Sequence, residues 1–95
     1  MTREEALAIL RRIEGIASTS NHEDAEAQSD ILDLVERLHD APGPAAIVRE
    51  KVASIAAWTE ILYSDDKRAT YGGDVEVTEL LLHDCERLRD AIKAD

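Results

Sequence analysis

Apolar residues recur every three or four positions along most of this chain, a spacing that is typical of amphipathic helices. Four segments carry the pattern, and they cover residues 3–17, 22–39, 44–63 and 74–93. No segment shows the sustained alternation of apolar and polar residues that marks a β-strand. The pattern therefore predicts a single all-helical domain over residues 1–95.

Residues between the predicted helices carry start and stop signals. Thr2 and Glu5 have the spacing of a capping box before the first helix. The Pro-Gly-Pro sequence at residues 42–44 ends the second helix, and its last proline suits the first turn of the third. Asp74 is a favourable N-cap for the fourth helix. Residues 64–73 show no periodicity, and we expect them to form the one long loop.

The third helix differs from the others because it is apolar over more than half of its circumference. Its main stripe is Val48, Val52, Ile55 and Leu62, with Thr59 among them. A second apolar strip lies roughly 80–140° away on the helical wheel and consists of Ile47, Trp58 and Ile61. Such a helix is either the most buried one or serves two interfaces.

The connections after the first two helices are short, which favours antiparallel neighbours. The simplest fold is therefore an antiparallel up-down four-helix bundle. Formation of a homodimer through the third helix is its natural extension, because a chain this short builds only a modest core alone.

Composition supports a globular chain and excludes a membrane protein. Hydrophobic residues make up 44% of the 95 residues, and only four glycines and two prolines occur. No apolar run approaches the roughly 20 residues that a membrane span needs. Arginines and glutamates interrupt the first apolar stretch, so it does not predict a signal peptide. Cys85 is the single cysteine, which fits a reducing compartment and a cytoplasmic location.

Charge narrows the possible partners. The chain has 21 acidic and 11 basic residues and a formal net charge of −10, which argues against nucleic acid as a direct ligand. Many of the acids form a ridge on each of two helices, with neighbouring charges about 5–6 Å apart. The ridge of the second helix is Glu23, Glu26, Asp30 and Asp33, and that of the fourth is Glu76, Glu79, Glu86 and Asp90.

These ridges have two interpretations. They keep the protein soluble, or they bind a basic partner. Mimicry of the DNA backbone is a special case of the second interpretation, because DNA also presents regularly spaced negative charge.

The sequence gives little support for a catalytic site or a metal-binding site. Glu79, His83 and Glu86 share one face of the fourth helix, but that face is the predicted solvent side. The Glu-x-x-His pair of di-iron bundles occurs once, at Glu36 and His39, and no second helix repeats it. We therefore expect no catalytic residue, no metal and no cofactor.

Two further features invite a structural interpretation. Asp84 falls inside the apolar arc of the fourth helix, where an unpaired carboxylate would be costly, so we expect it to meet Lys51, Arg87 or a backbone donor. The pair Lys67 and Arg68 precedes a Gly-Gly sequence and a helix start, an arrangement that can hold phosphate. The surrounding aspartates favour an ordinary connecting loop instead.

The leading hypothesis is a small acidic helical module, without catalytic activity, that binds another protein. The first alternative is an acidic DNA-mimic inhibitor of a nucleic-acid-binding complex, of the kind that phages use against restriction or CRISPR defences. The second alternative is a helical-bundle metal protein or enzyme. The first hypothesis relies on the apolar strip and the first alternative on the acidic ridges.

Overall fold

The computed structural model describes residues 1–94, and these residues fold into helices joined by turns, with no strand among them. The elements are α1 (Arg3–Thr19), α2 (Ala25–Arg37), the 3-10 turn η1 (Leu38–Asp40), α3 (Ala45–Leu62), α4 (Asp65–Thr70) and α5 (Asp74–Ala94). The all-helical prediction is confirmed.

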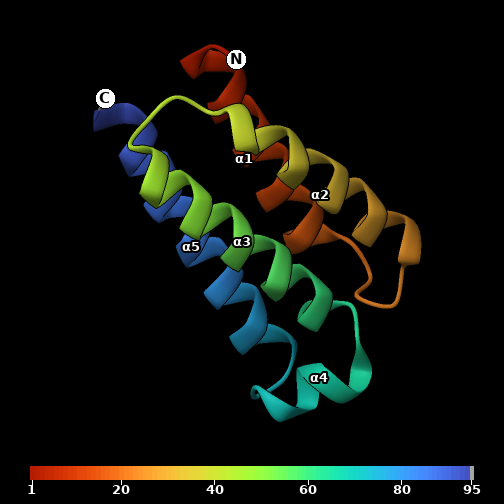
Figure 1. The fold of residues 1–95 in the computed structure, drawn as a ribbon. Helices are drawn as coiled ribbons and strands as arrows, with labels where there is room; N and C mark the ends of the chain where they lie inside the picture. The colour runs from red at the N-terminus through yellow and green to blue at the C-terminus, as the bar shows by residue number, and fades with distance from the viewer. Residues whose placement is uncertain (95) are drawn as a thin grey trace.

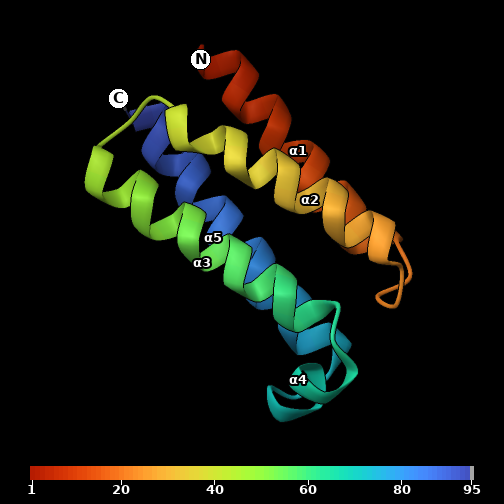
Figure 2. The same ribbon diagram turned by 45° about the vertical axis from the view of Figure 1, so that its right-hand side comes forward.

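The four long helices lie side by side in a molecule that measures 37 × 21 × 16 Å (Figure 1). Each long helix packs against two others, so that α1, α2, α3 and α5 follow one another around a common core. Both chain termini and the connection from α2 to α3 lie at one end of the molecule. The turn between α1 and α2 lies at the opposite end together with α4 (Figure 2). We call this opposite end the α4 end.

The core is built from the apolar stripes that the periodicity predicts. In α2 and α5 the buried apolar residues are Ala27, Ile31, Leu34, Val35, Val77, Leu81, Cys85, Leu88 and Ile92. In α1 the buried residues are Ala6, Ile9, Leu10, Ile13 and Ala17, whereas Leu7 is only partly buried. The whole main stripe of α3 is buried, and the Thr59 hydroxyl donates to the carbonyl of Ile55 at 2.7 Å.

The first helix begins as predicted. The Thr2 hydroxyl accepts from the Glu5 amide at 3.1 Å, and the Glu5 carboxylate accepts from the Thr2 amide at 3.2 Å. These hydrogen bonds to its charged form lower the pKa of Glu5. Both members of the capping box are therefore in place.

Helix α2 begins three residues later than predicted. Its N-cap is Asp24, whose side chain accepts from the amides of Glu26 and Ala27. The preceding residues are held in a turn, because the Asn21 side chain accepts from the Glu23 amide at 2.9 Å. Asparagine side chains that bond to nearby backbone in this way compete with helix formation.

The prediction that residues 64–73 form a loop is wrong for most of the segment, because α4 lies within it. Two acids in its first turn and two bases in its last turn complement the helix dipole. Its six residues are too few to show apolar periodicity, which explains why the pattern missed it. The chain then turns into α5 through Gly72 and Gly73, whose φ angles of 100° and 102° favour glycine.

Asp84 is buried and paired, as expected. Its side chain is 10% exposed, one oxygen lies 3.4 Å from Lys51 Nζ, and the other accepts from the Ser54 hydroxyl. The contact joins α3 to α5. Lysine was among the predicted partners, whereas Ser54 was not.

Within residues 1–94, no helix combines the length and the apolar character needed to cross a membrane.

Because the thiol of Cys85 is buried, we expect the protein to become less stable at alkaline pH. Burial raises the pKa of Cys85 from 9.0 to about 12, so above pH 9 the unfolded chain loses a proton that the folded chain keeps. We therefore expect the free energy of unfolding to fall by up to about 1.4 kcal/mol per pH unit above pH 9 from this group alone.

Urea unfolding between pH 7 and pH 11, with a reductant present, measures this effect. The Cys85→Ala variant lacks the thiol, so the stability difference between wild type and variant should shrink as the pH rises. A difference that stays constant over this range would contradict a buried thiol.

Candidate functional site

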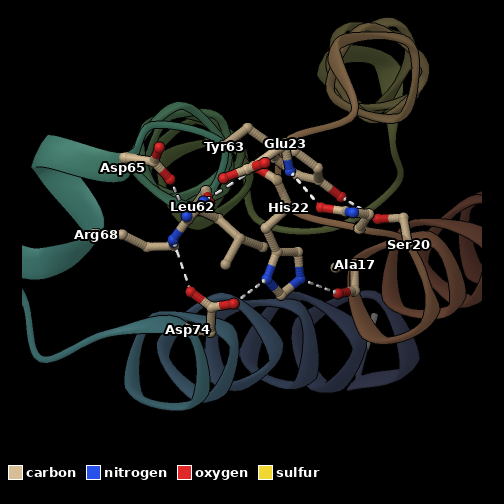
Figure 3. Close-up of polar contacts among 10 residues, drawn as sticks. Ala17, Ser20, His22, Glu23, Leu62, Tyr63, Asp65, Arg68 and Asp74 are labelled. Atoms are coloured by element: carbon tan, nitrogen blue, oxygen red, sulfur yellow. Dashed lines mark hydrogen bonds and ion pairs between the residues drawn. The ribbon is translucent and has the colours of Figure 1, made fainter.

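The α4 end of the molecule is organised around the guanidinium of Arg68 (Figure 3). Its side chain is 11% exposed. Nη1 donates to two backbone carbonyls, that of Leu62 at 2.7 Å and that of His22 at 3.0 Å. Nε lies 2.6 Å from Asp74 Oδ1, and Nη2 donates to Asp65. One side chain thus joins the end of α3, the α1–α2 turn, the start of α5 and α4 itself.

His22 completes this junction from the α1–α2 turn. Its Nδ1 lies 3.1 Å from Asp74 Oδ2, and its Nε2 lies 2.9 Å from the carbonyl oxygen of Ala17. Both ring nitrogens therefore face an acceptor, and neither is free to act as a base toward a substrate or to bind a metal. The geometry supports a structural role for this histidine.

Tyr63 forms the wall of the junction on the side of α3. Its ring meets the ring of His22 edge to face, with 5.5 Å between the centroids. Its hydroxyl lies 2.6 Å from the Ser20 hydroxyl, and burial raises the pKa of Tyr63. The turn after α1 is thereby fastened to the last turn of α3.

The junction fixes α4, and α4 positions an aromatic side chain against α3. The ring of Tyr71 packs edge to face on the ring of Trp58, with 5.3 Å between the centroids, while Tyr71 remains 49% exposed. Beside this pair lies a shallow groove of about 320 Å³. It is lined by Ala57, Glu60, Ile61, Lys67 and Tyr71. We call it the α3–α4 groove.

The apolar strip of Ile47, Trp58 and Ile61 is divided by the structure. Trp58 and Ile61 are partly buried against the core near the α3–α4 groove. Ile47 is 40% exposed and lies near the start of α3, beside a separate depression. Lys51 and Ser54 lie between the two parts and are paired with Asp84. The strip therefore offers two separate apolar patches.

The acidic ridges lie at the surface, as the helical wheel indicates. All eight carboxylates belong to exposed residues, and none takes part in an ion pair within residues 1–94. The fold does not bring the two ridges together, because α2 and α5 occupy diagonal corners of the molecule (Figures 1 and 2).

The carboxylates that do make ion pairs form a separate set. They are Glu14, Glu50, Asp65, Asp74 and Asp84. Four of these pairs join different elements, for example Glu14 of α1 with Arg89 of α5. The fold thus uses one group of acids internally and leaves the ridges to solvent.

Among residues 1–94, no three histidine, cysteine or acidic side chains are grouped so that they could hold a metal ion. Glu79, His83 and Glu86 are all exposed on the outer face of α5.

The sequence did not reveal the junction at the α4 end. The spacing of three residues between Asp65 and Arg68 is that of an ion pair within a helix, and it could have predicted this one contact of the junction. His22 lies 46 residues before Arg68, and no sequence pattern joins the two.

Comparison with protein-family models, with curated proteins and with solved structures finds no match for this chain.

The junction predicts a strong and specific effect of substituting Arg68. Arg68→Ala removes the guanidinium from two carbonyls and two carboxylates, of which only Asp74 keeps a second partner, and we expect the free energy of unfolding to fall by about 2–3 kcal/mol. Arg68→Lys should lose most of the same stability, because an ammonium group cannot contact four acceptors as the forked guanidinium does.

Urea unfolding measures the loss, and the fluorescence of Trp58, the single tryptophan, reports the position of Tyr71. Lys67→Ala is the matched control, because Lys67 is exposed and forms no ion pair within the described residues. Equal stability of the Arg68 and Lys67 variants would contradict the central role of the guanidinium.

Proposed function

We propose that the four long helices form an antiparallel up-down bundle and that this bundle acts, without catalysis, as a protein–protein interaction module. The observation that carries the proposal is the surface of α3 near α4. From residue 52 to residue 59 the helix has no charged residue, and Ala53 and Ala57 are exposed within that stretch. The partly buried Ile61 and the exposed Tyr71 continue the uncharged surface.

This surface has the composition that protein interfaces favour. Tryptophan and tyrosine are enriched among the residues that dominate binding energy, and charged residues are depleted at interface centres. An exposed tyrosine that rests on a tryptophan is a rigid contact of this kind. Small side chains beside it allow a partner helix to approach closely.

A second copy of the chain is one partner that this proposal admits. In that case α3 forms the dimer interface, and mass measured by light scattering rises with concentration. A cytoplasmic location belongs to the same proposal, since one buried free thiol fits a reducing compartment.

A second candidate function is inhibition of a nucleic-acid-binding complex by mimicry of DNA, as in phage proteins that block restriction or CRISPR defences. All eight ridge carboxylates are exposed and make no ion pair within residues 1–94, which favours this function. Their regular spacing along a helix is comparable to the regular charge of a phosphate backbone. Because the ridges lie on different helices, each ridge would imitate a phosphate backbone separately.

Two sets of variants distinguish these functions in a pull-down from a host lysate. Trp58→Ala removes the support of Tyr71, and we expect it to abolish capture of the partner if the α3 surface binds. Replacing Glu26, Asp30 and Asp33 with lysine should weaken that capture far less than Trp58→Ala does, because these residues lie on α2 and do not line the α3–α4 groove.

Mimicry of DNA requires the opposite result. The triple lysine variant would then lose its partner, and the wild-type complex would dissociate at moderate salt. Circular dichroism must first show that both variants are folded. If neither variant loses its captured proteins, both candidate functions are wrong.

A further inference from the structure

The charge of this protein is concentrated in one half of the molecule. The α4 end consists of the α1–α2 turn, α4 and the adjoining halves of the long helices (Figures 1 and 2). When each long helix is divided at its midpoint, this half comprises residues 12–30 and 54–83. It contains 11 acidic and 3 basic residues, a net charge of −8.

The other half is nearly neutral. Residues 1–11, 31–53 and 84–94 contain 9 acidic and 8 basic residues, a net charge of −1. The difference arises because arginine and lysine offset the acids only near the chain termini and the α2–α3 connection. A strong negative field therefore surrounds the α4 end alone, and such fields accelerate encounters with charges of opposite sign.

The α3–α4 groove lies in this acidic half. Ala57 and Ile61 come from α3, and Tyr71 forms the opposite wall. The charged lining residues, Glu60 and Lys67, are of opposite sign, so the groove itself is balanced. The excess negative charge lies elsewhere in the same half of the molecule, and Asp66 in the first turn of α4 is the nearest of these acids along the chain.

We propose that the α3–α4 groove binds a basic amphipathic helix of a partner protein. This inference rests on the proposed interaction function and names the chemistry of the partner. Apolar side chains of the helix pack on Ala57, Ile61 and Tyr71. Its lysines and arginines interact with Glu60, with Asp66 and with the negative field of the α4 end. A helix lying in an apolar groove is a recurring mode of peptide recognition.

The surface of α3 favours a helix over an extended segment. Ala53, Ala57 and Ile61 are spaced by four residues and follow one row along the helix. Such a row packs into the grooves of a second helix at an axial separation of about 8–10 Å. The two exposed alanines permit this close approach.

The negative charge of the α4 end argues against three other partners, namely a second copy of the chain, nucleic acids and anionic lipid surfaces. A second copy of this chain at the groove would bring two halves of charge −8 together, which is unfavourable. Nucleic acids and anionic lipid surfaces carry the same sign as the groove surroundings. A basic protein segment is the partner whose charge complements this half.

The test uses the full chain and a synthetic helix of about 18 residues that contains only leucine and lysine, arranged with helical periodicity. The peptide lacks tryptophan, so the fluorescence of Trp58 reports binding. We expect saturable binding that weakens at least tenfold in Ala57→Arg, which blocks the groove. The control Ala8→Arg adds the same charge to an exposed alanine of α1 and should change binding less than twofold.

A second matched pair tests the position of the charge. Glu60→Gln with Asp66→Gln, and Glu86→Gln with Asp90→Gln, each remove two negative charges, but only the first pair lies at the α4 end. We expect at least a fivefold loss of affinity from the first pair and less than twofold from the second. A peptide of the same composition without helical periodicity should bind at least tenfold more weakly than the amphipathic one.

Three results would overturn this inference. They are an absence of saturable peptide binding, equal losses from the two members of either matched pair, and a dimer in light scattering that Ala57→Arg converts to a monomer. Capture of a partner that depends on Trp58 is measured separately. If that capture persists while the peptide fails to bind, the interaction function stands and the basic helix is wrong. If both fail, the interaction function fails as well.

Discussion

Arg68 supplies the constraint on which the arrangement of the α4 end depends. Its guanidinium donates to carbonyls from two separate parts of the chain and contacts carboxylates from two others. A planar fork with five donors can satisfy such divergent acceptors at once. Without it, α4 would be connected to α5 by the short Gly-Gly turn and to α3 by two residues, Tyr63 and Ser64. The position of Tyr71, and therefore the groove beside Trp58, follows from this one side chain.

The structure also separates two uses of negative charge. Acids such as Asp74 and Asp84 join helices, because each lies against a cation or a hydroxyl from another element. The ridge acids make no such contact within residues 1–94 and are exposed. Rows of like charge at helical spacing destabilise a helix slightly. Solubility and the proposed binding of a basic partner are the two explanations for these rows, and both concern the surroundings of the protein rather than its fold.

The α3–α4 groove and the net negative charge of the α4 end have complementary physical effects. An apolar contact contributes affinity that salt hardly weakens, whereas exposed charges mainly affect the rate and selectivity of association. The α4 end combines both properties, and the opposite end of the molecule is nearly neutral. Any partner attracted by long-range charge is therefore directed to the end that also carries Trp58, Ile61 and Tyr71.

The apolar pattern by itself determined the helices and most of the core, since burial of one face at a period of 3.6 residues requires little else. It also indicated that Asp84 would be paired. It could not identify α4, because six residues are too few for periodicity. Nor could it bring His22, Arg68 and Asp74 together, because their contacts join residues that are far apart in sequence. The divided apolar strip, the separated ridges and the groove were decided by how the helices pack, because packing sets which faces meet and which remain exposed.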